Sequence, residues 1–210
     1  NCKLELTDVT IDAAIGILIA ETGGQNALIA DSSALPEQLV KDALTSAFGS
    51  AGQRCSAARV LFVQRDIADK VMGMMAGAMA ELTVGDPGLL STDVGPVIDA
   101  EALATLGAHA ERMEKEARLI GRTLLGPNTE HGNFFAPRAY ELKSLNQLSR
   151  EVFGPVLHVI PFDAGQLDAL VSTPLDDLLA FRHVERPKGW NRALLIALFG
   201  VWWMIERIVG

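Results

Sequence analysis

Cys55 is the residue of this sequence best placed for covalent chemistry. It ends a turn of small residues, Ser50 to Gly52, that follows an amphipathic helical pattern and precedes an apolar strand pattern. A thiol held between two packed elements stays fixed yet approachable, as a nucleophilic cysteine requires. The alternative is that Cys55 is a small buried apolar residue, as most free cysteines are. Its placement alone leaves both interpretations open, because reactivity depends on the pKa of the thiol.

Glu21 is a second candidate for chemistry. It follows the apolar run 17–20, which we interpret as a buried strand, and it opens a turn in which Gly23 and Gly24 permit a close approach of the backbone. Burial raises the pKa of a carboxyl group, and a carboxylate with a raised pKa suits a general base. The alternative, a solvated turn glutamate, is the one that this local pattern favours.

The elements that must position these residues alternate between strands and helices. Apolar residues recur at helical spacing after Pro36, over about 67–82 and over about 100–119. Short apolar runs at 27–30 and 59–64, and another after the Gly-Pro turn at 154–155, indicate buried strands. This alternation predicts an α/β domain with a largely parallel sheet flanked by helices.

Composition limits the classes of function. A chain of 210 residues with 49% hydrophobic and 21% charged residues can bury one good core. Its formal net charge of −8 argues against nucleic acid as a partner, because binding to phosphates needs clustered Lys and Arg. We therefore expect a globular protein that does not bind nucleic acid.

Cysteine and histidine usage argues against disulfides and metals. The sequence has 2 Cys and 4 His, the histidines are scattered, and no close Cys pair is present. We read His109 and His131 as structural or surface residues. The sequence begins at Asn1, without an initiator Met or a signal peptide. We therefore expect a cytoplasmic protein, and a chain that is a fragment of a longer reading frame.

The pattern changes after about residue 171. Residues 172–192 mix charges and prolines without a period, and residues 193–205 form an uninterrupted apolar run. As a helix this run would span roughly 20 Å, short of the roughly 30 Å of a bilayer core. A packed apolar tail is favoured over membrane contact by 193–205, which stays open.

Three separated motifs resemble those of the aldehyde dehydrogenase superfamily: Glu21–Asn26, Gly52–Cys55 and Glu151–Pro155. The residues around these motifs most resemble the L-glutamate γ-semialdehyde (pyrroline-5-carboxylate) dehydrogenase module of proline utilization A proteins. The resemblance covers residues 17–171 and implies a partial catalytic domain. Residues 1–16 and 172–210 do not resemble the family.

The resemblance implies a role for each matching residue on the substrate side. Cys55 is the expected nucleophile, whose thiolate attacks an aldehyde carbon, and its backbone N–H helps to hold the oxyanion. Glu21 is expected to activate the water that releases the carboxylate product. Ser56 is expected to help bind the carboxylate of the substrate. The implied reaction is NAD-dependent oxidation of L-glutamate γ-semialdehyde through a thiohemiacetal and a thioester.

The resemblance also implies an NAD site. Glu151 is expected to bind the nicotinamide ribose, Phe153 to pack beside the nicotinamide, and Gly23 to lie against the cofactor. The family's dinucleotide-binding (Rossmann) domain lies upstream of Glu21 and is not recognisable here. We therefore expect the parent chain's Rossmann domain, or a second copy of the chain, as a protein partner. A catalytically incompetent fragment that only folds or associates with a partner or membrane is the alternative.

Overall fold

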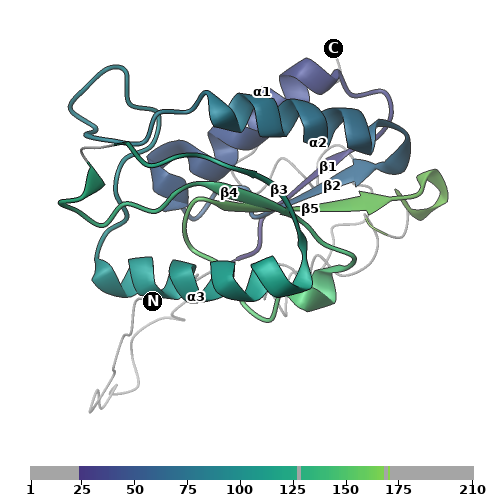
Figure 1. The fold of residues 1–210 in the computed structure, drawn as a ribbon. Helices are drawn as coiled ribbons and strands as arrows, with labels where there is room; N and C mark the ends of the chain where they lie inside the picture. The colour runs from purple at the N-terminus through teal and green to yellow at the C-terminus, as the bar shows by residue number, and fades with distance from the viewer. Residues whose placement is uncertain (1–23, 127–128, 168–169, 171–210) are drawn as a thin grey trace, which may run out of the picture.

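A five-stranded sheet with helices on both faces forms the described part of the chain (Figure 1). The computed structural model describes residues 24–126, 129–167 and 170. The strand order is β1-β2-β5-β4-β3. Neighbouring strands are parallel, except that β3 runs antiparallel to β4. The prediction of an α/β domain with a largely parallel sheet is confirmed.

The two central strands carry apolar residues on both faces. Val60–Gln64 (β2) and Val156–Phe162 (β5) are buried along almost their whole length. Both faces of a parallel sheet are covered by helices, which explains these continuous apolar runs. The other strands are β4 (Arg138–Glu141), which lies between β5 and β3, and the two edge strands β1 (Ala27–Ala30) and β3 (Arg118–Arg122).

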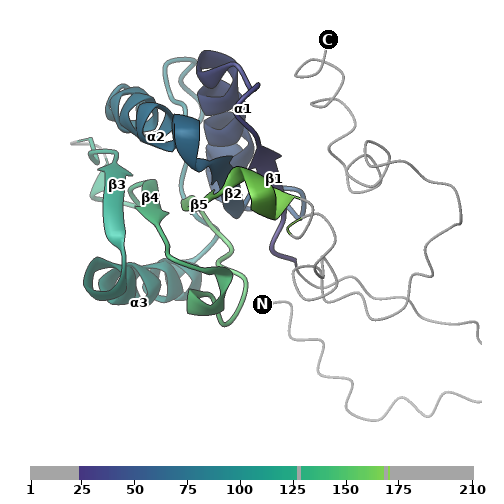
Figure 2. The same cartoon turned by 90° about the vertical axis from the view of Figure 1, so that its right-hand side faces the viewer.

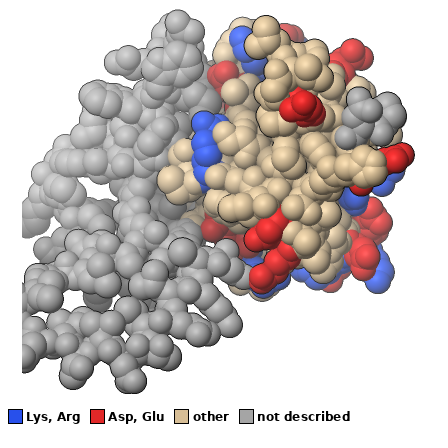
Figure 3. Space-filling model, turned by 90° about the vertical axis from the view of Figure 1, so that its left-hand side faces the viewer, with Lys and Arg blue, Asp and Glu red and all other residues tan. Residues whose placement is uncertain are grey.

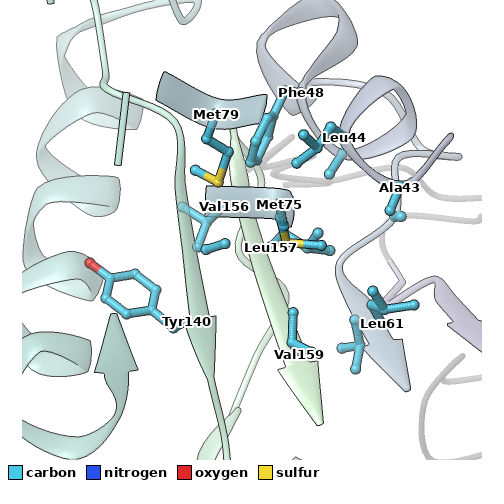
Figure 4. Close-up of a cluster of buried hydrophobic side chains, with 14 of the residues drawn as sticks. Ala43, Leu44, Phe48, Leu61, Met75, Met79, Tyr140, Val156, Leu157 and Val159 are labelled. Carbon is cyan, nitrogen blue, oxygen red and sulfur yellow. The ribbon is translucent and has the colours of Figure 1, made fainter. Parts of the chain in front are cut away.

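Helices α1 (Pro36–Phe48) and α2 (Arg65–Ala80) cover one face of the sheet, and α3 (Ala100–Glu116) covers the other (Figures 1 and 2). Proline is favoured in the first turn of a helix, where its missing N–H leaves no bond unmade, and Pro36 begins α1. Buried side chains of α1, α2 and β5 meet between the helices and the sheet (Figure 4). This apolar core fixes the strands whose ends carry the motif residues.

The prediction that the third helix continues to residue 119 is wrong. The helix ends at Glu116, because Ala117 takes an extended backbone conformation with φ −137° and ψ 163°. Arg118 then begins β3, which pairs with β4. Strand pairing satisfies the backbone groups of these residues and overrides a helical pattern that local spacing alone suggests.

The surface carries both signs of charge. Acidic side chains are spread over several parts of the face in Figure 3, with basic side chains among them. The pairs Arg65–Asp163 and Lys70–Glu37, at 2.7 and 3.3 Å, are solvent-exposed. Such pairs contribute about 0–1 kcal/mol each, so core packing dominates stability.

Several sequence predictions lie outside the described residues. These are the strand at 17–20, the apolar run at 193–205 and the segments 1–16 and 172–192, so the predicted domain boundaries stay predictions. Within the described ranges, none of the helices is both long and apolar enough to cross a bilayer.

Candidate functional site

The turn before Cys55 has an unusual backbone. Helix α1 ends at Phe48, and a 3₁₀ turn (η1) covers Gly49–Gly52. Ser50 and Ala51 have φ values of 55° and 53°, and Gly52 has φ 64°. Consecutive left-handed residues are costly outside glycine and persist where the surroundings hold them. Cys55, three residues later, is a free, exposed thiol, so the structure does not place it as a buried apolar residue.

Asn26 ties this turn to the first motif. Its side-chain amide donates to the carbonyl oxygens of Cys55 and of Ala57, the latter at 3.0 Å. Its own carbonyl accepts from the backbone N–H of Arg59 at 2.9 Å. The Glu21–Asn26 segment therefore holds the cysteine turn through its last residue.

Replacing Asn26 with Ala is expected to lower the free energy of unfolding by about 2 kcal/mol, because two side-chain hydrogen bonds at about 1 kcal/mol each are lost. Asn26→Asp, which has the same shape but cannot donate, is expected to cost at least as much. Urea denaturation measures both. The exposed Asn146 provides the control: Asn146→Ala should change stability by less than about 0.5 kcal/mol. An equal loss for both alanine variants would contradict this role.

The cysteine turn also packs directly on the Glu151–Pro155 segment. A Cβ atom built on Gly52 would lie 2.3 Å from the carbonyl oxygen of Gly154, closer than real Cβ atoms approach. Only a glycine therefore fits where the two segments touch. Since this segment precedes β5 and the cysteine turn precedes β2, both lie at the amino ends of neighbouring parallel strands.

Glu151 is shared between the first motif and a buried arginine. The backbone N–H of Gly24 donates to its Oε2 at 3.1 Å, and Arg59 Nε donates to its Oε1 at 3.2 Å. The three motifs of the sequence thus meet at one edge of the sheet. Glu21 and Gly23 lie outside the described residues, and Ser56 is half-buried beside Cys55.

Arg59 is the residue that sequence reasoning missed. Its side chain is 1% exposed and donates to the carbonyl oxygens of Gly52, Arg54 and Gly154 at 2.6, 3.2 and 3.2 Å. The Phe153 ring, 42% exposed, lies 4.9 Å from the guanidinium carbon. The signal was present in the sequence, because a charged residue directly before a buried apolar run needs buried partners.

A fourth segment joins the site through Gln53. Its side-chain oxygen accepts from the backbone N–H of Ile98 at 2.8 Å, and its amide donates to the carbonyl oxygen of Pro96 at 3.5 Å. The Asp93–Ile98 stretch is therefore tied to the turn that carries Cys55.

Two cavities of about 550 and 520 Å³ lie elsewhere in the described part of the chain. The larger is bordered by Arg65 and Pro161, at the carboxyl ends of the central strands, and the smaller by α1 and α2. Neither includes Cys55 or Glu151. Within the described residues, the candidate site combines the exposed thiol of Cys55 with the largely buried carboxylate of Glu151.

Two histidines pack behind this edge. His158, in β5, lies with its Nε2 2.9 Å from Nε2 of His109, in α3, and its Nδ1 is 3.0 Å from the carbonyl oxygen of Arg59. Because a carbonyl only accepts, Nδ1 of His158 carries the proton and its Nε2 accepts from His109. This contact agrees with the interpretation of His109 as a structural residue. The sequence pattern did not predict that His158 is its partner.

The chain belongs to the aldehyde dehydrogenase family, which it matches over residues 8–172. The match begins before residue 17, so the expectation that residues 1–16 do not resemble the family is wrong for residues 8–16. Two relatives show where in the family it lies. It is 51% identical over 160 residues to the bifunctional protein PutA of Escherichia coli (strain K12), covering 73% of this chain and 12% of that protein. It is 34% identical over 142 residues to a 1-pyrroline-5-carboxylate dehydrogenase of Geobacillus sp. (strain WCH70), covering 67% of this chain and 27% of that enzyme.

Solved structures agree in fold. A crystal structure of a bifunctional proline utilization A (PutA) protein superposes with TM-score 0.72 and 52% identity, over 77% of this chain and 16% of that one. Betaine aldehyde dehydrogenase from Staphylococcus aureus in complex with NAD⁺ superposes with TM-score 0.65 and 28% identity. The match covers 70% of this chain and 30% of that one. The chain spans 12–30% of the length of these four relatives.

Proposed function

We propose that this chain is the catalytic-domain part of an NAD-dependent dehydrogenase that oxidises L-glutamate γ-semialdehyde to L-glutamate in proline catabolism, in the cytoplasm. The observation that supports it most is the meeting of three motifs at one edge, where an exposed thiol, Cys55, lies on a segment packed against the Glu151 segment. The relatives named PutA and 1-pyrroline-5-carboxylate dehydrogenase support the substrate class.

The residues of this edge fit the nicotinamide end of NAD. Each oxygen of the Glu151 carboxylate accepts one hydrogen bond from the protein and keeps further lone pairs for ribose hydroxyls. The half-exposed ring of Phe153, held over the Arg59 guanidinium, offers a flat apolar surface beside it. In our proposal, Glu151 and Phe153 orient the cofactor and Gly23 approaches it. When bound, NAD⁺ supplies the hydride acceptor.

The covalent steps fall to Cys55. Its thiolate adds to the aldehyde carbon, so that a C–S bond forms and the carbonyl electron pair moves to oxygen, where the Cys55 backbone N–H can donate to it. Loss of hydride from that carbon leaves a thioester. Glu21 takes one proton from water as the water oxygen attacks the thioester, and the C–S bond breaks to release the thiolate. The carboxylic acid product loses its proton to solvent. In our proposal, Ser56, beside the nucleophile, binds the substrate carboxylate.

The partner in this proposal is a Rossmann domain of the same polypeptide. The PutA relatives are larger proteins, of which this chain matches 12%. Glu151 and Phe153 account for one end of a dinucleotide, and a second domain is needed to bind the other end. A second copy of the chain is the other protein partner consistent with the proposal.

A chimaera tests the proposal in a complete enzyme. Residues 24–167 of this chain replace the matching segment of the Escherichia coli PutA, and NADH production from L-glutamate γ-semialdehyde is followed by absorbance. We expect the activity of the chimaera to lie within about tenfold of that of its parent. Cys55→Ala is expected to lower the activity of the chimaera by at least about 10³-fold, since covalent catalysis requires the thiol. Thr45→Ala, at an exposed position on α1, is the matched control for a small substitution near the turn.

Two results would contradict the proposal. One is a folded chimaera without NAD-dependent oxidation, which would favour a catalytically incompetent domain. The other is a Cys55→Ala chimaera that keeps activity, which would remove Cys55 from the mechanism.

A further inference from the structure

Arg59 is a buried charge at the point where the cysteine turn and the Glu151 segment meet. Burial lowers the pKa of this guanidinium, and the Glu151 carboxylate acts in the opposite direction. An arginine side chain that is 1% exposed is tolerated only where its charge is paired and its N–H groups have acceptors. Both conditions are met here by the two segments that carry the proposed chemistry.

The acceptors of Arg59 lie on both sides of the site. On the cysteine turn they are the carbonyl oxygens of Gly52 and Arg54, at 2.6 and 3.2 Å. On the other segment they are the Glu151 carboxylate and the Gly154 carbonyl oxygen, both at 3.2 Å. A planar guanidinium reaches acceptors in fixed directions, whereas a lysine ammonium on its flexible stem does not reproduce this geometry.

We propose that Arg59 is a positioning residue that fixes the Cys55 turn relative to Glu151, and so relative to the nicotinamide ribose site. This inference rests on the proposed function for its consequence, because in that function the thiol and the cofactor must face the same carbon atom. A displacement of about 1 Å between reacting groups can cost about 10²-fold in rate. Arg59 therefore couples two segments that lie 92 residues apart in the sequence.

The inference separates Arg59 from an ordinary packing residue. If Arg59 only stabilised the fold, its loss would loosen the molecule everywhere. If it positions the site, its loss raises hydrogen exchange of the cysteine turn first, and a change at Glu151 reaches that turn mainly through Arg59. Amides of the turn report this, because Gln53 N donates to Ser50 O at 3.0 Å and Ala57 N to Arg54 O at 3.1 Å.

The test measures amide hydrogen exchange by mass spectrometry on the full chain. Arg59→Met is expected to raise exchange of residues 52–57 by about tenfold or more, while peptides of α2 and α3 change by less than about twofold, since local opening exposes only the segment that it releases. Arg59→Lys, which keeps the charge, is expected to raise exchange of the turn by about threefold or more. This second variant serves if Arg59→Met does not fold.

Arg138 provides the matched control. It pairs with Glu114 at 2.9 Å and lies 5.1 Å from the ring of Phe135, so it repeats the carboxylate and aromatic contacts of Arg59. Its side chain makes none of the described hydrogen bonds to the cysteine turn. Arg138→Met is therefore expected to leave exchange of residues 52–57 within about twofold of the unsubstituted chain.

The coupling between the two segments is the decisive readout. Glu151→Gln is expected to change exchange of the cysteine turn by about threefold or more in the Arg59 chain and by less than about 1.5-fold in the Arg59→Met or Arg59→Lys chain. The proposal is overturned if Glu151→Gln leaves the turn unchanged in the Arg59 chain, or has the same effect with and without Arg59. It is also overturned if Arg59→Lys matches the parent, or if exchange rises equally everywhere. Because no catalysis is measured, failure here is distinct from failure of the proposed function.

Discussion

Replacing Gly52 with Ala is expected to destabilise the protein by more than about 4 kcal/mol, because the new side chain would overlap backbone atoms and strain the backbone. The new Cβ would lie 2.3 Å from the Gly154 carbonyl oxygen and 2.7 Å from that of Ala47. Both contacts are with backbone atoms, which cannot move away by rotation of a side chain. The φ of +64° adds a further cost of about 1–2 kcal/mol for a residue with a Cβ. Because the total free energy of unfolding of a domain is about 5–15 kcal/mol, the variant is expected to be largely unfolded or easily denatured.

Three variants separate the contact from the conformation. Gly52→Asn tolerates positive φ better but keeps the Cβ, so it should be nearly as harmful as Ala. Gly154→Ala meets the flexible end of Leu106 at 2.6 Å and should cost about 1–3 kcal/mol. Gly107→Ala, in α3 with open space around it, should raise stability by up to about 1 kcal/mol. Urea denaturation of all four variants is the measurement. A mild Gly52→Asn variant would show that φ, not the contact, sets the cost.

Local sequence patterns account for most of the elements. The apolar spacing after Pro36 predicts the buried face of α1, and the run at 59–64 predicts β2, because both depend on neighbours in the chain. The turn of small residues that follows this helical pattern correctly marks the end of α1. The motifs likewise predict that three separated segments belong to one site, and the contacts of Gly24, Gly52 and Glu151 place the segments together.

The features that local patterns do not predict depend on contacts between residues that are distant in the sequence. Nothing near Arg59 shows that its partner Glu151 lies 92 residues away, and nothing near His109 shows His158. The start of β3 at Arg118 is set by pairing with β4, which overrides the local helical pattern. Long-range partners such as these are fixed by topology and packing rather than by periodicity.

The His109–His158 contact gives the protein a dependence on pH that follows from its hydrogen bonds. The order of donors runs from Arg112 to His109, from His109 to His158, and from His158 to the Arg59 carbonyl oxygen. Both rings are neutral in this arrangement. A proton added to Nε2 of His158 would face the N–H of His109, and no acceptor would remain between the two rings.

Burial is the main reason that both rings stay neutral. It lowers the pKa of His158 from 6.5 to about 3 and that of His109 to about 4. The nearby cations act in the same direction: Arg112 and Arg150 on His109, and Arg112 and Arg59 on His158. The Arg59 carbonyl oxygen opposes the shift of His158. Because the folded pKa values lie below those of the unfolded chain, the unfolded chain binds more protons between about pH 6.5 and pH 4, and stability falls as the pH falls through that window.

At pH 5 the two histidines together are expected to lower the free energy of unfolding by about 4 kcal/mol relative to pH 7, or by about 2 kcal/mol each. Each pH unit below the unfolded pKa lowers this free energy by about 1.4 kcal/mol for each histidine that stays neutral in the fold. The free energy of unfolding in urea, measured at half-unit steps from pH 7.5 to 5, tests this. His109→Gln keeps a side-chain donor but cannot be protonated, so it should remove about half of this fall. His131→Gln, at an exposed position, should leave the slope unchanged. Equal slopes for His109→Gln and the parent would show that this pair does not set the acid sensitivity of the fold.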